Sequence, residues 1–339
     1  MSEIRSDLMS FSRIIVAPER GERPDCFSID QGEYTLPIEK CPFCAGHEDM
    51  TPPEIYRIQN SDHPDQWQTR VVPNKYPLLR VETLLTREGT LFADTISGVG
   101  AHEVIIETPN HHLKPWEYTP TQLESVFAVI CSRIDDLRRD SRIRYITAFK
   151  NYGTGAGATM EHPHSQIVGL PMFPPRIKSI FSRVRDYYDK KERCFFCDMI
   201  KFEMNEETRV ICDNDDFVAF CPYSSWAPFL VAVYPKHHMH DITRMDSGIR
   251  KNFARILVEL YRRFYEALGD VPLNAFLHTA PSFVKQLNHP EYWSNIEFDY
   301  HWHLELLPRI TKVGGLELAT GVSVNVVPPN QSAEFLRKL

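Results

Sequence analysis

Two long segments of the chain carry apolar residues at the spacing of an amphipathic helix. In the first segment these residues are Leu123, Val126, Phe127, Ile130, Ile134 and Leu137. In the second they are Phe253, Ile256, Leu257, Leu260, Phe264 and Leu268. Steps of three and four residues place each set on one helical face, so we predict two helices that pack against a core. Thr119-Pro120 suits the start of the first helix, and Gly269 suits the end of the second.

Shorter apolar runs, typical of buried strands, accompany the helices at residues 103–107, 145–149, 229–234 and 274–278. The order of features repeats once. Each half has a Cys-x-x-Cys pair, an apolar run followed by a proline and two adjacent histidines, a long helix, a second apolar run and a strand-like His-x-His. Such self-similarity indicates a duplicated unit. We therefore expect an α+β fold of two tandem halves, in which a largely antiparallel sheet extends across both copies and packs with helices.

Prolines mark the expected boundary between the halves. Pro171, Pro174 and Pro175 precede a basic, polar stretch that ends near residue 192. Proline clusters of this kind punctuate a chain between structural units. We place an N-terminal half at residues 1–180 and a C-terminal half at residues 181–339.

Composition and charge narrow the class of protein. Hydrophobic residues make up 42% of the chain and charged residues 24%, which is typical of a globular protein. The formal net charge is -7, without a run of Lys or Arg, and this argues against a long nucleic acid as partner. No apolar run approaches the roughly 20 residues of a membrane span, and the N-terminus lacks the apolar region of a secretory signal. We expect a cytoplasmic protein that does not enter membranes.

Cysteine spacing separates two roles for the eight cysteines. In a reducing compartment they are expected to be thiols or metal ligands rather than disulfides. Four stand alone in the sequence, and we interpret them as ordinary buried thiols: Cys26, Cys131, Cys212 and Cys221. The other four form two Cys-x-x-Cys pairs.

Each cysteine pair, followed in order by histidines, predicts a tetrahedral zinc site. Two thiolates and two imidazoles suit zinc, although iron stays open. The expected ligands are Cys41, Cys44, His111 and His162 in the first half, and Cys194, Cys197, His238 and His301 in the second. The adjacent His112 and His237 are alternatives to His111 and His238. Four protein ligands leave no position for water, so both ions are predicted to be structural. The competing interpretation is that these are buried turn thiols and core histidines.

The segment at residues 151–166 carries the predicted chemistry. Its small residues, including Gly157, let backbone amides approach a phosphate, and Thr159 adds a hydroxyl donor. On a strand, His162 and His164 face the same side. His162 is assigned to the metal, which leaves His164 free to attack phosphorus and carry the nucleotide covalently. Gln166 is placed to donate its amide to a phosphate oxygen as charge develops.

These residues make the chain resemble the galactose-1-phosphate uridylyltransferase family of the histidine-triad superfamily. The most specific match is His162-Pro163-His164-Ser165-Gln166 with the preceding glycine loop, and the resemblance covers nearly the whole chain. It implies two tandem histidine-triad-like halves and a nucleotidylated His164, with Gln166 holding phosphate. It also implies substrate contacts from Arg20, Arg23, Asn74, Asn151, Thr159 and Glu317.

Departures from the family pattern bear on the substrate. Typical sugar-specific members carry Pro or Gly at the position of Ser165. They also have an aromatic residue before the glutamate, whereas this chain reads Gly314-Gly315-Leu316-Glu317. Both features resemble an ADP-sugar phosphorylase branch, in which phosphate accepts the nucleotidyl group. The resemblance further implies a homodimer in which Glu317 contacts substrate from the partner subunit. His303 corresponds to His164 in the second half, but Trp302 and Leu304 to Leu306 replace the polar loop there, so we expect a role other than nucleophile.

The sequence thus predicts a nucleotidyltransferase that moves a nucleoside monophosphate from a nucleotide sugar to a hexose 1-phosphate, as UDP-glucose–hexose-1-phosphate uridylyltransferase does. An ADP-sugar phosphorylase using phosphate is the alternative. A non-catalytic zinc-stabilised nucleotide-binding module is an alternative of another class. A hydrolase that releases UMP or AMP to water is a third.

Overall fold

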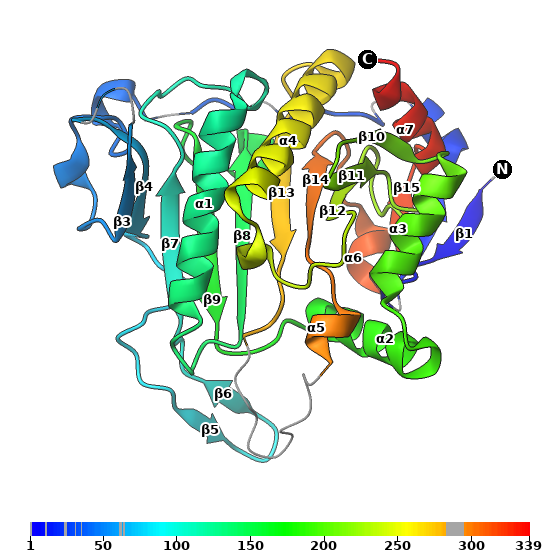
Figure 1. The fold of residues 1–339 in the computed structure, drawn as a ribbon, viewed down its shortest axis with the longest axis horizontal. Helices are drawn as coiled ribbons and strands as arrows, with labels where there is room; N and C mark the ends of the chain where they lie inside the picture. The colour runs from blue at the N-terminus through cyan, green and yellow to red at the C-terminus, as the bar shows by residue number, and fades with distance from the viewer. Residues whose placement is uncertain are drawn as a thin grey trace.

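The computed structural model describes residues 2–10, 12–23, 26–30, 32–34, 36–60, 63, 65–282 and 295–339. Its centre is a ten-stranded sheet in which every pair of neighbouring strands is antiparallel (Figure 1). In sheet order the strands are β10 (Val210–Asp213), β11 (Phe217–Phe220), β12 (Val231–Pro235), β14 (His303–Pro308), β13 (Leu273–His278), β8 (Tyr145–Tyr152), β9 (His164–Leu170), β7 (Ala101–Ile106), β4 (Trp67–Pro73) and β3 (Tyr56–Gln59).

The sheet order displays the duplication. Five strands from each half occur in mirrored order, and the halves meet where β8 pairs with β13. At this junction Phe149 lies opposite Phe276 and Asn151 opposite Asn274. The prediction of one largely antiparallel sheet running through both copies is confirmed.

The two predicted helices are α1 (Pro120–Leu137) and α4 (Ser247–Leu268), which lie side by side across one face of the sheet (Figure 1). The Thr119 hydroxyl accepts from the Gln122 amide at the start of α1, and Gly269 ends α4 at φ +76°. The glycine supplies a left-handed backbone without a Cβ clash. Phe127 and Phe253 pack edge to face at 4.6 Å between the helices. Each fully buried side chain of this size contributes about 1.5–3 kcal/mol.

The stretch expected to join the halves is itself helical. Helix α2 (Pro175–Lys191) begins with a proline at its first position, where the missing amide proton costs nothing. It buries one apolar face, formed by Ile177, Ile180, Phe181 and Val184. Helix α3 (Phe195–Glu206) follows directly. The division that we place at residue 180 therefore falls inside a helix, and the division remains a prediction.

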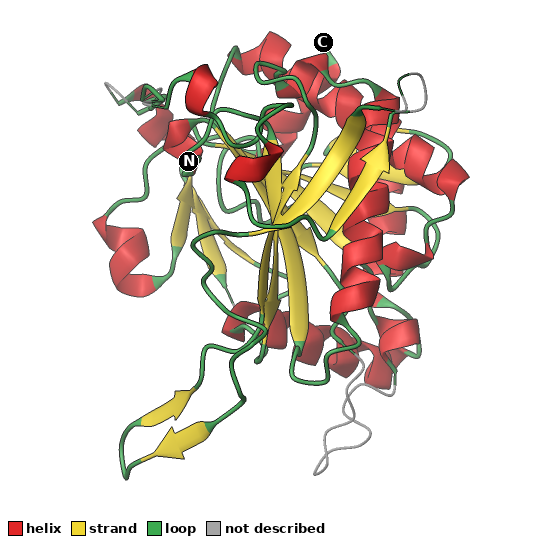
Figure 2. Cartoon of the chain, turned by 90° about the vertical axis from the view of Figure 1, so that its left-hand side faces the viewer, coloured by secondary structure: helices red, strands yellow, loops and turns green. Residues whose placement is uncertain are grey.

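Smaller elements surround the sheet. Strands β1 (Glu3–Ser6), β2 (Arg13–Val16) and β15 (Ser323–Asn325) form a separate sheet. The hairpin β5 (Arg87–Gly89) and β6 (Asp94–Ile96) projects from the body (Figures 1 and 2). Short helices are α5 (Ile296–Asp299), α6 (Gly315–Thr320) and α7 (Pro329–Arg337), with 3-10 turns at Pro18–Glu22, Ile38–Lys40, Glu48–Met50, Pro115–Glu117, Thr154–Ala156 and Ile242–Arg244.

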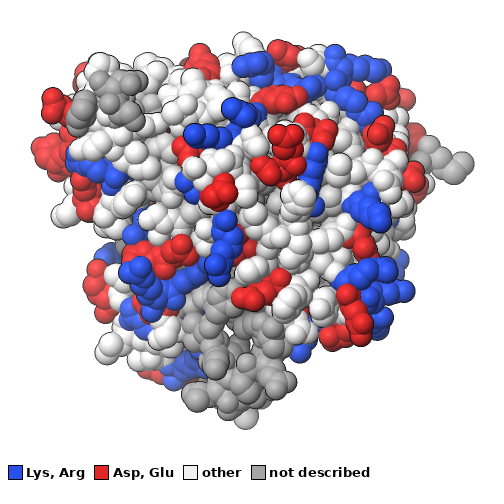
Figure 3. Space-filling view, in the orientation of Figure 1, with Lys and Arg blue, Asp and Glu red and all other residues white. Residues whose placement is uncertain are grey.

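The helices and the surface charge bear on the class of protein. None of the helices in the described parts of the chain has both the length and the apolar character to cross a membrane. On the face drawn in Figure 3, Lys and Arg side chains are interspersed with Asp and Glu.

The predicted strand position of His162 and His301 is wrong, because β9 begins at His164 and β14 at His303. Both outer histidines lie in the loops that lead into these strands.

Candidate active site and metal centres

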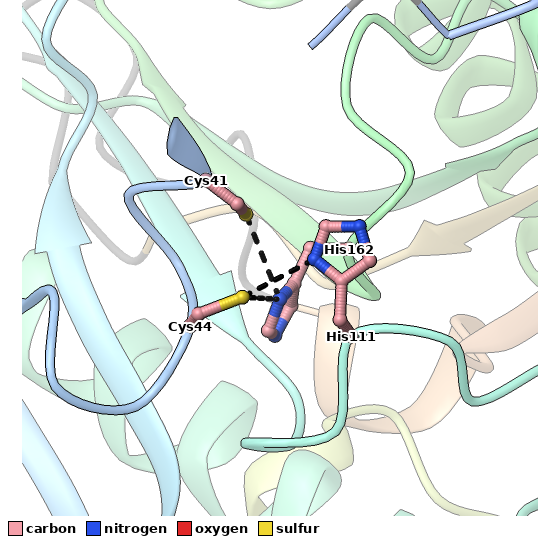
Figure 4. Close-up of side chains that lie close together, drawn as sticks. All are labelled: Cys41, Cys44, His111 and His162. Carbon is pink, nitrogen blue, oxygen red and sulfur yellow. Dashed lines mark hydrogen bonds between the residues drawn. The ribbon is translucent and has the colours of Figure 1, made fainter. Parts of the chain in front are cut away.

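The first predicted metal ligands converge although they come from three separate segments (Figure 4). The sulfur of Cys44 lies 3.2 Å from Nδ1 of His111 and 3.6 Å from Nδ1 of His162. The sulfur of Cys41 lies 3.7 Å from the same nitrogen of His162. With Zn–S of about 2.3 Å and Zn–N of about 2.0 to 2.1 Å, a tetrahedral ion separates sulfur from nitrogen by roughly 3.6 Å. The four atoms therefore fit zinc.

Geometry distinguishes between the adjacent histidines of the first site. His111 is buried within the cluster, whereas the His112 side chain is 64% exposed and contacts Glu161. Nε2 of His162 donates to the Thr108 carbonyl at 2.7 Å, which turns Nδ1 toward the sulfurs. Burial lowers the pKa of His162 to about 4, so the ring is neutral as metal binding requires.

The second cluster has the same composition in the C-terminal half. Cys194 lies at the N-cap of α3, so that Cys197 falls in its first turn. The Cys197 sulfur is 3.3 Å from Nδ1 of His238 and 3.8 Å from Nδ1 of His301. Nε2 of His238 donates to the Glu297 carbonyl at 2.8 Å. The cluster therefore contains His238 rather than His237.

The unpaired cysteines divide into two groups. Cys131 and Cys221 are buried, as expected, whereas Cys26 and Cys212 are half-buried. Burial raises the pKa of Cys131 to about 12 and that of Cys212 likewise to about 12. Both remain protonated thiols at neutral pH, with little nucleophilic character.

His164 begins β9, and its backbone contact fixes its protonation. Nδ1 donates to the carbonyl of His162 at 2.8 Å. In a neutral imidazole the lone pair is then on Nε2, which is the nitrogen able to attack. Burial lowers the pKa of His164 and keeps the ring neutral. One hydrogen bond thus joins His164 to the backbone of His162, a member of the first Cys/His cluster.

Gln166 is oriented by a histidine that the sequence analysis missed. The backbone amide of Leu78 donates to Nδ1 of His102 at 3.1 Å, so Nε2 of His102 carries the proton. Nε2 of His102 donates to Oε1 of Gln166 at 2.8 Å. The side-chain amide nitrogen of Asn74 lies 3.1 Å from the same Nε2. The Gln166 carbonyl is therefore occupied and its NH₂ is left to donate. The available signal was His102 itself, a polar residue that lies next to Glu103 in a strand whose other residues are apolar.

The glycine loop follows β8 and is fixed by the second half of the chain. Gly153 has φ +81°, and an added Cβ on Gly155 would lie 2.5 Å from the Asp30 carbonyl oxygen, so neither position accepts a side chain. Asn274 on β13 donates to Oδ1 of Asn151 and to the Ala156 carbonyl, both at 2.9 Å. This arrangement leaves the amide of Asn151 to donate. The predicted contacts Gly157 and Thr159 lie exposed at the end of this loop.

A hollow of about 210 Å³ brings together three residues predicted from distant positions: Arg20, Arg23 and Glu317. Lys312 also lines it. The carboxylate of Glu317 accepts from the Gly314 amide at 3.1 Å, which caps α6. The hollow therefore concentrates positive charge around one acidic group and suits an anionic substrate.

A buried polar network next to His164 was also missed by the sequence analysis. The Glu107 carboxylate accepts from the hydroxyls of Tyr118 and Ser165, and pairs with Nζ of Lys150 at 2.6 Å. Lys150 also donates to the His164 carbonyl at 3.4 Å. Ser165, the neighbour of His164 in β9, is thus hydrogen-bonded to the buried Glu107–Lys150 ion pair.

Sequence comparisons assign both halves of the chain. Residues 180–338 match the galactose-1-phosphate uridyl transferase C-terminal domain, and residues 92–173 match the N-terminal domain of a family of unknown function, DUF4931. ADP-glucose phosphorylase of Arabidopsis thaliana is 31% identical, with alignment over 99% of this chain and 93% of that protein. Galactose-1-phosphate uridylyltransferase of Thermotoga maritima is 25% identical over 100% of this chain and 98% of that protein.

Structural comparison agrees. The crystal structure of ADP-glucose phosphorylase from Arabidopsis thaliana with bound ADP-glucose superposes with a TM-score of 0.83 at 28% identity, covering 100% of this chain and 99% of that chain. The mirrored sheet and this chain-long superposition define a duplicated α+β fold. The chain belongs to the galactose-1-phosphate uridylyltransferase family, which includes its ADP-glucose phosphorylase relatives.

Proposed function

We propose that this chain is a nucleotidyltransferase that acts on nucleotide sugars through a covalent intermediate on His164. One observation supports this above all. The hydrogen bond from Nδ1 of His164 to the His162 carbonyl leaves Nε2 as the nucleophilic nitrogen, beside the donor amide of Gln166. The two residues lie on the same face of β9, two positions apart.

The reaction takes two displacements at one phosphorus atom. Nε2 of His164 forms a bond to the α-phosphorus of the nucleotide sugar, and the bond to the β-phosphate oxygen breaks to release a sugar 1-phosphate. An acceptor phosphate oxygen then attacks the same phosphorus, and the P–N bond breaks to restore the imidazole. Gln166 donates to a non-bridging oxygen in both steps, while the glycine loop supplies backbone amides.

The clusters at Cys41 and Cys194 are proposed to hold zinc. A closed four-ligand site supplies no open coordination position, so the ion stabilises the fold and fixes the His162 loop. The thiolates of such sites persist in the reducing cytoplasm, where we place the protein.

For the acceptor we propose inorganic phosphate, with an ADP-sugar as donor. The relative at 31% identity is an ADP-glucose phosphorylase. The hydroxyl of Ser165 donates to the Glu107 carboxylate. Sugar-specific members of the family that this chain resembles typically carry Pro or Gly at this position. Phosphate attack on the adenylylated histidine would yield ADP, and the first step yields glucose 1-phosphate.

Uridylyl transfer to a hexose 1-phosphate is the second candidate. The match of residues 180–338 to the galactose-1-phosphate uridyl transferase C-terminal domain supports it. A panel of ADP-glucose and UDP-glucose, each tested with phosphate, glucose 1-phosphate and galactose 1-phosphate, separates the two. Strictly phosphate-dependent release of ADP supports the phosphorylase. Exchange of UMP between hexose 1-phosphates supports the uridylyltransferase.

Mass spectrometry tests the covalent step itself. Incubation with the preferred donor and no acceptor should add one nucleotidyl group to His164. A His164→Gly variant should lose the adduct and turnover while still binding nucleotide. If that variant keeps full turnover, the assignment fails. Binding without any transfer in the parent chain supports a zinc-stabilised binding module instead, and acceptor-independent release of AMP or UMP supports a hydrolase.

We further propose a homodimer. The projecting hairpin exposes large apolar side chains, with Leu91 at 88% and Phe92 at 94% exposed. Apolar side chains grouped at the tip of a projecting arm are typical of an interface. The dimer would let Glu317 reach substrate bound to the partner subunit.

A further inference from the structure

The second half contains a pocket at the position that the duplication makes equivalent to the catalytic site. On β9, Gln166 lies opposite Phe149 of β8. On β14, Glu305 lies opposite Phe276 of β13. The mirrored strand order therefore makes Glu305 the counterpart of Gln166 and His303 the counterpart of His164. Three strand spacings separate the two sites, which is roughly 14 Å.

A pocket of about 250 Å³ opens at this second position. Its lining includes Ser10, Arg176, Ser224, Trp226, His303 and Glu305. The imidazoles of His303 and His278 stack at 4.3 Å, with their planes 14° apart. The pocket is thus built from the sheet, from α2 and from the N-terminal strand region, and it shares no residue with the hollow of Arg20 and Arg23.

Several buried polar atoms in this pocket are unsatisfied. Nε2 of His303, Oε2 of Glu305 and Nε1 of Trp226 are buried and have no hydrogen-bond partner among the described residues. Oε2 of Glu305 lies 3.6 Å from both His278 Nε2 and Arg176 Nη2, which is too long for a hydrogen bond. Buried unsatisfied groups are costly, and the three residues that carry these atoms all line one pocket, which points to a missing ligand.

The charges around the pocket select the chemistry of that ligand. The neutral amide of Gln166 is replaced by the carboxylate of Glu305, and Asp7 adds a second carboxylate against the single cation Arg176. Asp7 already accepts from the hydroxyls of Ser10 and Ser224. The excess of negative charge disfavours phosphate. Serine hydroxyls, imidazole nitrogens and an indole suit a ligand that both donates and accepts hydrogen bonds.

We propose that this pocket binds a neutral, hexose-sized sugar, with Glu305 accepting from its hydroxyls and Trp226 donating to one of them. The duplicated half has thereby kept a binding site after losing the nucleophilic loop. The pocket lining includes none of the residues proposed to hold the phosphate, so binding here should not depend on nucleotidyl transfer.

Saturation-transfer NMR with the zinc-loaded chain and free glucose or galactose tests the proposal. A hexose signal at millimolar concentration is expected. It should persist in His164→Gly, because that change affects only the catalytic site. Glu305→Gln keeps the shape of the side chain and removes its charge, so hexose affinity should fall about tenfold or more. Nucleotidyl transfer and melting temperature should stay unchanged in Glu305→Gln.

A second variant keeps the test decisive if Glu305→Gln fails to fold. Trp226→Leu, at the half-buried wall of the pocket, should also weaken hexose binding. The proposal is overturned by a hexose signal that disappears in His164→Gly but survives in Glu305→Gln, or by no signal at all. Inorganic phosphate binding that is lost in Arg176→Ala would also overturn it. So would a third metal ion per chain that Glu305→Gln releases.

Discussion

The buried Glu107–Lys150 pair offers a prediction whose size follows from the structure. Both side chains are almost fully buried, with 2% and 8% exposure, and their charged atoms are 2.6 Å apart. Removing one partner of such a pair costs about 3 to 5 kcal/mol, because the other charge stays buried without compensation. We expect Lys150→Met, which keeps the length of the side chain, to lower the free energy of unfolding by this amount near neutral pH.

The effect should depend on pH with a definite sign. Burial by itself raises the pKa of Glu107, but Lys150 and the hydrogen bonds from Ser165 and Tyr118 outweigh burial and hold it below its usual range. In the parent chain this stabilisation is present above the unfolded pKa of about 4.3 and is lost as pH falls through the folded pKa. Without Lys150, burial raises the pKa of Glu107. The variant then takes up a proton on folding, so its deficit should shrink as pH falls from about 7 to about 5.

Urea unfolding of parent and variant, followed by tryptophan fluorescence at each pH, measures the difference. Glu107→Gln in the Lys150→Met background should recover part of the loss, because a neutral amide oxygen still accepts from Ser165 and Tyr118. Lys338→Met, which removes an exposed pair with Glu334, is the control and should change nothing measurable. A loss below about 1 kcal/mol that does not vary with pH would refute the reasoning.

Three further predictions follow from the site. His102→Leu should lower kcat by about tenfold to a hundredfold with little change in KM, because Gln166 loses its orienting donor; single-turnover transfer measures this, and an unchanged kcat would contradict it. Cys41→Ser and Cys194→Ser should each release one zinc ion and lower the melting temperature, as elemental analysis and calorimetry will report; retention of both ions would argue against these ligands. Phe92→Asp should produce monomers in light scattering, whereas an unchanged mass would place the interface elsewhere.

The sequence by itself determined the features that depend on neighbouring residues. Helical periodicity and the Thr119 cap predicted α1 and α4, since both signals act within a turn or two of the helix. The repeated order of cysteine pairs, helices and histidines predicted the duplication and its continuous sheet. The two-residue spacing of His162 and His164 also indicated a strand, because residues two positions apart on a strand share a face. The start of that strand was predicted too early. Pro163 and the loop that carries His162 precede the strand, which begins at His164.

The tertiary structure alone decided what depends on residues far apart in the chain. His111 and His112 have equivalent spacing, and only the approach of the Cys44 loop separates the buried ring from the exposed one. His102 contacts Gln166 and Asn274 contacts Asn151 across neighbouring strands, so the local sequence does not reveal these partners. The pocket at Glu305 arises because two copies of one unit share a sheet. Hydrogen bonds and burial are set by which strands become neighbours, and that pairing follows from the packing of the whole sheet.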